Sequence, residues 1–212
     1  MARRLNNVRV SSIDTMLPFS GGCDSTLVLW NWLRENPGKK LLVYHVVLKN
    51  FEGRQDLELN ACHRILDWMR AQGLTNFEYE EMGFDYGTLR KIIFDMEIWA
   101  LWDGIILRAK KNANIKNILC PYIKTNHQAE MLTGRHITRV AVTKLISKRP
   151  LNYLMPIMNM DKEAILNALH PDLRKMVWYC RRPVNGGDPC HKCFTCVAVD
   201  RAIAKNKTLI ET

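Results

Sequence analysis

The chain has 212 residues, of which 47% are hydrophobic, and this apolar content is sufficient for a buried core. No stretch approaches the roughly 18 uncharged apolar residues of a membrane helix, and the first residues lack the apolar centre of a secretory signal peptide. We therefore expect a cytoplasmic protein without a membrane partner.

The formal net charge of the whole chain is +10, and the positive charge is concentrated in one segment. Between Gly104 and Met160, ten Lys and Arg residues stand against one acid, Glu130, so this segment alone carries +9. A localised positive field suits a polyanion such as ATP or RNA, or an acidic substrate. A solvated basic face is the alternative for any one of these side chains.

Short apolar runs alternate with segments of helical period, which is the pattern of a parallel sheet flanked by helices. We expect strands over 16–19, 41–47, 76–81 and 117–120, and helices over about 25–35, 56–70 and 90–111. Residues 136–148 alternate like a strand but are long enough for a helix. Asp161 is a candidate N-cap of a further helix, and a cysteine-rich tail begins at Trp178.

The stretch MLPFSGGCDSTLVLW, residues 16–30, places glycines and polar residues where a strand passes into a helix. The N–H groups of such a turn converge with the helix N-terminus and attract phosphate oxygens. The predicted nucleotide-binding residues are Phe19, Ser20, Gly21, Gly22, Asp24, Ser25 and Thr26. A carboxylate beside a phosphate is repulsive unless a divalent cation lies between them, so Asp24 indicates Mg²⁺.

Four of the seven cysteines crowd the C-terminal part in a C-x9-C-x2-C-x2-C pattern, namely Cys180, Cys190, Cys193 and Cys196. In a cytoplasmic chain such clustering indicates metal rather than disulfides. Four thiolates close a tetrahedral shell, which is typical of structural Zn²⁺. An iron–sulfur cluster and unligated thiols are the alternatives, and His191 is a competing ligand.

The S-G-G-x-D-S-T loop resembles the signature of the PP-loop ATP pyrophosphatases, which split ATP between its α and β phosphates to adenylate a substrate. Combined with the four-cysteine motif, it resembles the 7-cyano-7-deazaguanine synthases, which are zinc enzymes of queuosine biosynthesis. Two inner stretches support the resemblance. FEGRQDLELNA, residues 51–61, keeps Arg54, Glu58, Leu59 and Ala61 of a family motif, and PIMNMDKEAI, residues 156–165, resembles the family's lysine-led helix start.

The resemblance implies an adenine nucleotide alpha hydrolase-like fold, with a PP-loop domain over residues 1–175 and a zinc-binding lobe over 176–212. It implies a ligase that uses ATP, Mg²⁺ and Zn²⁺ to convert 7-carboxy-7-deazaguanine and ammonia into the nitrile, and a homodimer. Asp24, Arg54 and Glu58 are the catalytic candidates. For Arg54 and Glu58, the alternative to a catalytic role is that each is a solvated residue at the start of a helix.

Departures from the family pattern keep other functions open. Glu52, Gly53 and Gln55 replace the family residues around Arg54, and the family's Arg-Asn pair is missing from IWALWDGIIL. One alternative is therefore a PP-loop enzyme that adenylates a different carboxylate, amide or nucleic-acid base. The other is a zinc-containing RNA-binding module with a vestigial nucleotide site. Nucleic acid is not the favoured partner, because the loop keeps every polar residue that ATP binding uses.

Overall fold

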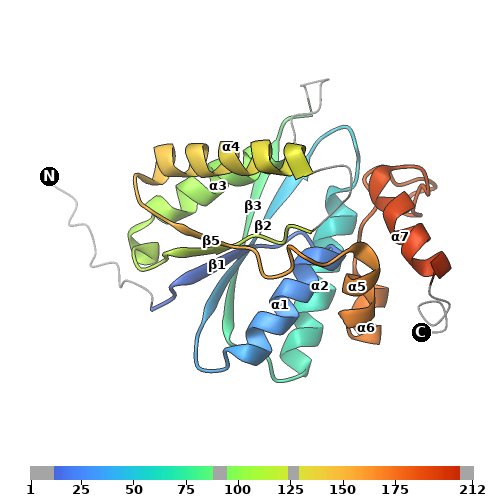
Figure 1. Ribbon diagram of the computed structural model, residues 1–212, viewed down its shortest axis with the longest axis horizontal. Helices are drawn as coiled ribbons and strands as arrows, with labels where there is room; N and C mark the ends of the chain where they lie inside the picture. The colour runs from blue at the N-terminus through green and yellow to red at the C-terminus, as the bar shows by residue number, and fades with distance from the viewer. Residues whose placement is uncertain (1–11, 88–94, 124–128, 206–212) are drawn as a thin grey trace, which may run out of the picture.

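The computed structural model describes residues 12–87, 95–123 and 129–205 (Figure 1). At its centre lies a five-stranded sheet in which all strands run parallel, in the order β3-β2-β1-β4-β5. The strands are β1 (Thr15–Pro18), β2 (Leu41–Lys49), β3 (Phe77–Asp85), β4 (Asn117–Leu119) and β5 (Asn152–Leu154). The strand order reverses at β1, since β2 and β4 lie on opposite sides of it. Open α/β sheets bind ligands at the carboxyl ends of their strands at such a switch point.

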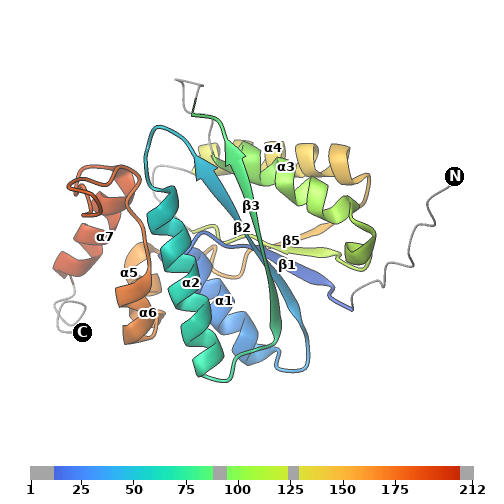
Figure 2. The ribbon, with the colours of Figure 1, turned by 180° about the vertical axis from the view of Figure 1, so that it is seen from behind.

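Helices cover both faces of the sheet. They are α1 (Cys23–Glu35), α2 (Gln55–Ala71), α3 (Asp95–Arg108), α4 (Ala129–Ser147), α5 (Lys162–Ala168), α6 (Pro171–Met176) and α7 (Phe194–Lys205), with a 3₁₀ turn η1 (Lys110–Asn112) after α3. α3 and α4 lie on one face, whereas α1 and α2 lie on the other beside α5 and α6 (Figures 1 and 2). Within the described ranges, no helix is long and apolar enough to cross a membrane.

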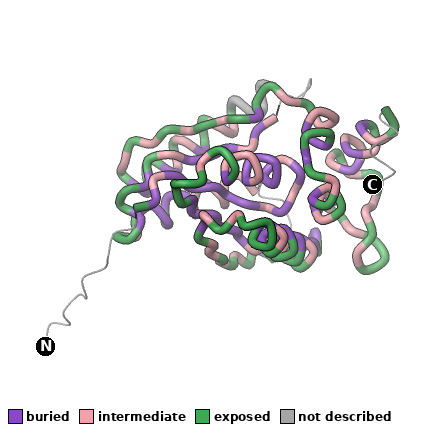
Figure 3. Tube along the Cα trace, turned by 90° about the horizontal axis from the view of Figure 1, so that it is seen from below, coloured by how far each residue is buried: buried purple, intermediate pink, exposed green. Residues whose placement is uncertain are grey.

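The core consists of two apolar layers, one on each face of the sheet. Neighbouring strand residues point to opposite faces, so Leu17 and Val43 belong to the layer under α1 and α2, whereas Met16 and Tyr44 belong to the layer under α3. The buried segments run through the middle of the molecule (Figure 3). Strands buried on both faces explain the continuous apolar runs in the sequence.

The helices α3 and α4 approach each other closely at Gly104. A Cβ atom built at this position would lie 2.5 Å from the Cβ atom of Ile146. A glycine is therefore required here, because any side chain would push the two helices apart.

The predicted strands and helices are confirmed, with ends that differ by a few residues, and residues 88–94 of the predicted helix 90–111 lie outside the described ranges. Residues 136–147 of the ambiguous segment belong to helix α4, and Lys148 follows its end. Its pattern is unusual because Arg139 and Thr143 are buried, whereas Ile137 and Leu145 are exposed by 62% and 77%. β5, α6 and α7 were not predicted from the sequence.

Candidate functional site

The loop from Phe19 to Gly22 links β1 to α1 at the switch point of the sheet. It is anchored to the neighbouring strand, because the Phe19 N–H donates to the Tyr44 carbonyl at 2.7 Å. Gly21 has a φ of +67°, and a Cβ atom there would lie 3.1 Å from the backbone nitrogen and the sulfur of Cys62. Both the conformation and the space therefore require glycine.

The first turn of α1 faces this loop. Gly22 occupies the N-cap position and brings no side-chain oxygen to cap the helix, so the N-terminal end of the helix dipole is available to an anion. Two hydroxyls line the turn: Ser20 and Ser25 lie 3.2 Å apart, and the Ser25 hydroxyl donates to the Gly22 carbonyl at 3.2 Å. Thr26 is fully buried in the same turn.

An ion pair stands at the mouth of the loop. Asp24 Oδ1 lies 2.5 Å from Lys162 Nζ, and the two side chains are 30% and 15% exposed. Lys162 is the first residue of α5, whose N-terminus is capped by Asp161 through a 2.8 Å bond from the Ala164 N–H. Burial alone would lower the pKa of Lys162, but the Asp24 carboxylate raises it overall, so the ammonium stays charged.

Lys162 is a site residue that the search for motifs did not select. The lysine-led helix start in PIMNMDKEAI was the available indication, but the sequence did not reveal that this lysine meets Asp24.

Arg54 and Glu58, the other two catalytic candidates, lie in a buried charge cluster at the carboxyl end of β2. Arg54 is 5% exposed and bonds to Glu52 at 2.8 Å, to Asp95 at 2.6 Å and to Glu58. Arg181, from the cysteine-rich tail, bonds to Glu52 and Asp95 as well. The cluster thus contains three carboxylates and two guanidinium groups. The catalytic role of Arg54 and Glu58 stays a prediction.

The excess of carboxylates has a consequence for Glu58. Burial raises the pKa of Glu58 to about 7, and although Arg54 lowers it, the nearby Asp95 raises it further. The three carboxylates together raise the pKa of Arg54, which remains charged although it is buried. A carboxyl group with such a pKa takes up a proton near neutral pH.

Two further loop neighbours are core residues. Cys23 is 2% exposed, and burial raises the pKa of its thiol to about 11, so the neutral thiol packs in the core, as expected from its variable position in the motif. His45 is 1% exposed, and its Nδ1 lies 2.7 Å from the Phe19 carbonyl oxygen. Burial lowers the pKa of His45, so its ring is neutral. Its contact with the Phe19 carbonyl holds the start of the loop.

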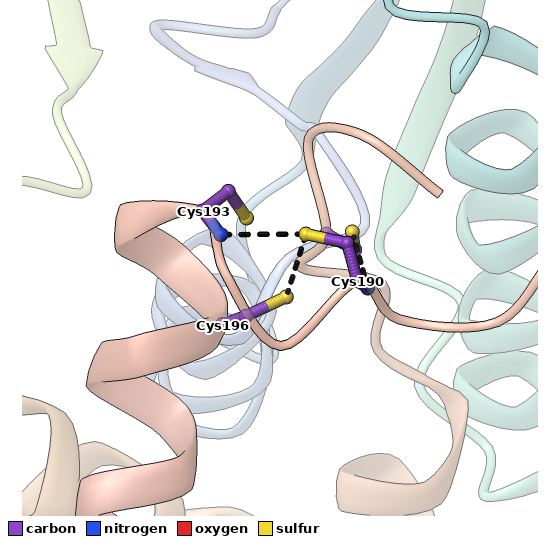
Figure 4. A group of neighbouring side chains, drawn as sticks. Cys190, Cys193 and Cys196 are labelled. Carbon is purple, nitrogen blue, oxygen red and sulfur yellow. Dashed lines mark hydrogen bonds between the residues drawn. The ribbon is translucent and has the colours of Figure 1, made fainter. Parts of the chain in front are cut away.

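The four predicted metal ligands come together. The sulfurs of Cys180, Cys190, Cys193 and Cys196 all lie within 4.8 Å of one another, and Figure 4 shows Cys190, Cys193 and Cys196 as neighbours. The backbone N–H of Cys190 donates to Cys180 Sγ, and that of Cys193 donates to Cys190 Sγ, both at 3.3 Å. Such bonds stabilise thiolate ligands. His191 points elsewhere, with its Nδ1 3.0 Å from Asp200.

One pair of sulfurs has the separation expected for two ligands of one tetrahedral ion. A metal–sulfur distance of about 2.3 Å places the sulfurs about 3.8 Å apart, and Cys190 Sγ lies 3.9 Å from Cys196 Sγ. Four cysteine sulfurs this close together could hold a metal ion.

Comparison with known proteins bears on the fold. No protein-family model matches the chain, and no curated protein matches its sequence. Among solved structures, the chain is similar to the U34-tRNA thiolase NcsA from Methanococcus maripaludis with its [4Fe-4S] cluster. The two superpose with a TM-score of 0.54 at 15% sequence identity, over 96% of this chain and 67% of that one. The fold is PP-loop-like. At this identity the similarity establishes the architecture and leaves the reaction open.

Proposed function

We propose that the chain is an enzyme that splits ATP between the α and β phosphates to adenylate an acceptor. The observation that carries this proposal is the Asp24–Lys162 ion pair. The pair lies beside a glycine-containing loop and beside a helix N-terminus that has no side-chain cap. This combination lies at the switch point of a parallel sheet, where such folds bind ligands.

Each part of the loop has a task in this reaction. Gly21 and Gly22 allow close approach of phosphate oxygens to backbone N–H groups. Asp24 keeps a second carboxylate oxygen for Mg²⁺, while Lys162 offsets negative charge on the departing pyrophosphate. The positioned charges favour the separation of AMP from pyrophosphate, so the chemistry needs no nucleophilic side chain of the protein.

The acceptor we propose is 7-carboxy-7-deazaguanine. Its carboxylate would attack the α phosphorus of ATP and release pyrophosphate; ammonia would displace AMP to form an amide. The amide oxygen would then attack the α phosphorus of a second ATP and release pyrophosphate, and loss of AMP and a proton would leave the nitrile. Support comes from the resemblance of the loop, the cysteine motif and residues 51–61 to the synthases of this reaction. The same resemblance supports a homodimer and a structural Zn²⁺ held by the four cysteines.

The test is an assay of the metal-loaded protein with Mg-ATP, ammonium and 7-carboxy-7-deazaguanine, in which AMP and the nitrile are measured by mass spectrometry. We expect both products, and we expect Asp24→Ala to abolish them. Asp56→Ala, which removes an exposed carboxylate of α2, is the matched control and should retain activity. AMP without nitrile would contradict the proposed acceptor, and folded protein that yields neither product would contradict the enzyme proposal.

A nucleic-acid base is the second candidate acceptor, and one observation favours it. Exposed lysines lie on and beside the turn after α3 and the C-terminal half of α4: Lys110, Lys116, Lys144 and Lys148. The similar solved structure is named as a tRNA thiolase. In the same assay, AMP release that depends on added tRNA and falls steeply with salt would favour this acceptor. The salt dependence arises because cations bound to RNA phosphates are released on binding.

A further inference from the structure

The chain that leads into the four cysteines touches the nucleotide loop directly. The Trp178 N–H donates to the Gly21 carbonyl at 2.9 Å, and the Trp178 carbonyl lies 3.4 Å from the position of a Cβ atom on Gly22. Cys180, two residues later, is a ligand of the predicted metal. The metal lobe and the nucleotide loop are therefore separated by a very short piece of chain.

Arg181, the next residue, makes a second connection from the lobe to the body of the protein. Its Nε and Nη2 donate to the two carboxylate oxygens of Glu52, at 3.2 and 3.1 Å, and its Nη1 lies 3.0 Å from Asp95 Oδ2. On the lobe side its guanidinium lies 5.8 Å from the ring centroid of Phe194, the first residue of α7. One side chain thus bridges the lobe, the loop after β2 and the start of α3.

The acidic partners of Arg181 are also the partners of Arg54. Glu52 Oε2 accepts from both guanidinium groups, whereas Asp95 Oδ2 accepts from Arg54 and forms an ion pair with Arg181. Glu52 and Arg54 are 7% and 5% exposed, so solvent does little to screen these charges. Without Arg181, three carboxylates would face a single guanidinium in a buried place, and repulsion would separate Glu52 from Asp95.

We propose that Arg181 is a positioning residue that couples metal occupancy of the four-cysteine lobe to the order of the loop 50–54 and the start of α3. A bound metal fixes Cys180 and therefore the backbone that presents Arg181. The guanidinium then holds Glu52 and Asp95 together at the carboxyl end of the sheet, beside the nucleotide loop. Its effect on turnover rests on the proposed function, whereas its effect on local order does not.

Hydrogen exchange provides a test that needs no substrate. In the metal-loaded wild type, we expect slow exchange of the amides in residues 50–58, and removal of the metal with a chelator should raise their exchange rates about tenfold or more. In metal-loaded Arg181→Gln the same amides should already exchange at the fast rates, and chelation should add little. Arg182→Gln is the matched control, because this neighbouring arginine is exposed, and it should behave as the wild type.

Two results would overturn the coupling. One is slow exchange over residues 50–58 in metal-loaded Arg181→Gln, and the other is a full response of that variant to chelation. Arg181→Lys keeps the charge but loses the paired donors, so its amide exchange rates over residues 50–58 should lie between those of the wild type and of Arg181→Gln. This variant replaces Arg181→Gln in the test if the glutamine variant does not fold. Metal content, measured for every variant, should remain at the wild-type level.

Turnover provides the second readout. Arg181→Gln should raise the KM for the acceptor about tenfold, a change of about 1.4 kcal/mol, while the Kd for ATP in the absence of acceptor should change less. An unchanged KM in a variant whose exchange is fast would limit the role of Arg181 to stability and overturn its positioning role. Absence of turnover in the wild type would contradict the proposed function alone.

Discussion

Lys162 Nζ lies 2.5 Å from Asp24 Oδ1, although 138 positions separate the two residues in the chain. The contact joins the start of α5 to the first turn of α1 and places a positive charge beside the glycine-containing loop between β1 and α1. The Asp24 carboxylate is therefore paired with a cation that a helix distant in the sequence contributes.

Lys162→Gln should lower the rate of AMP release about 100-fold, because a positioned charge on the leaving pyrophosphate is lost. In the double variant Asp24→Asn, Lys162→Gln, the activation free energy should rise by less than the sum of the increases in the two single variants, since both substitutions remove the same contact. Rates of AMP formation measure this. Lys175→Gln, on the exposed side of α6, is the control, and a wild-type rate in Lys162→Gln would refute the assignment.

Cys193→Ser should weaken metal binding and lower the melting temperature of the protein, because three thiolates leave the fourth position of the tetrahedral site without a protein ligand. Elemental analysis and thermal unfolding measure the two effects. His191→Gln should retain one ion per chain, since His191 pairs with Asp200 outside the sulfur cluster. Purified wild type should contain zinc without the visible absorption of an iron–sulfur cluster, and iron with sulfide would overturn the single-ion assignment.

Glu58 should give the protein a measurable pH dependence. Its pKa is raised from 4.5 to about 7 in the folded state by burial, against the opposing effect of Arg54 and with the support of Asp95. Between these values the folded state binds a proton that the unfolded state has released, so this contribution is fully present below pH 4.5 and is lost as the pH rises through 7. Glu52 and Arg181 complete the charges around it.

The variant Glu58→Gln should therefore gain stability relative to the wild type as the pH rises from 4.5 past 7. Free energies of unfolding from urea titrations across this range measure the difference. Glu35→Gln, an exposed residue at the end of α1, should follow the wild type. A difference between Glu58→Gln and the wild type that does not vary with pH would contradict the raised pKa.

Two glycine substitutions should have opposite effects. Gly104→Ala should cost about 1–3 kcal/mol of unfolding free energy, since its Cβ would lie 2.5 Å from Ile146 Cβ. Gly134→Ala in α4 should instead stabilise by up to about 1 kcal/mol, because no atom lies within 4 Å of its Cβ position and alanine favours helices. Denaturant unfolding checks both, and equal effects would contradict the close α3–α4 contact.

The basic segment between Gly104 and Met160 shows how a charge count differs from a binding surface. Arg139 is 3% exposed and donates to Asp103 at 2.7 Å, so it is a structural ion pair. Arg149 donates to backbone carbonyls, among them that of Ala113 at 2.8 Å. Because these arginines pair within the protein, fewer cations are available to a polyanion than the sequence alone indicates. Lys124 and Glu130 lie outside the residues whose side chains are described.

Strand and helix positions were predictable where local pattern and burial agree, as in the apolar run 41–47. The sequence pattern was ambiguous in α4, since Arg139 and Thr143 face inward whereas Ile137 and Leu145 face outward, and this distribution defeats a prediction from hydrophobic period. β5 is too short for a periodic pattern. The division of the chain into two domains at 175/176 stays a prediction. Val199 of α7, from the second of these, packs in the same apolar layer as Leu33 of α1.

The sequence by itself determined the glycine-containing loop between β1 and α1 and the cysteine cluster, because the residues of each lie close together along the chain and their geometry follows from local backbone chemistry. Gly21 with its positive φ and the short spacing from Cys190 to Cys196 belong to this class. Tertiary structure alone decided the pairing of Lys162 with Asp24 and of Arg181 with Glu52, which are 138 and 129 positions apart. Charges so distant in sequence meet only when the helices pack on the sheet, so their partners cannot be identified from spacing.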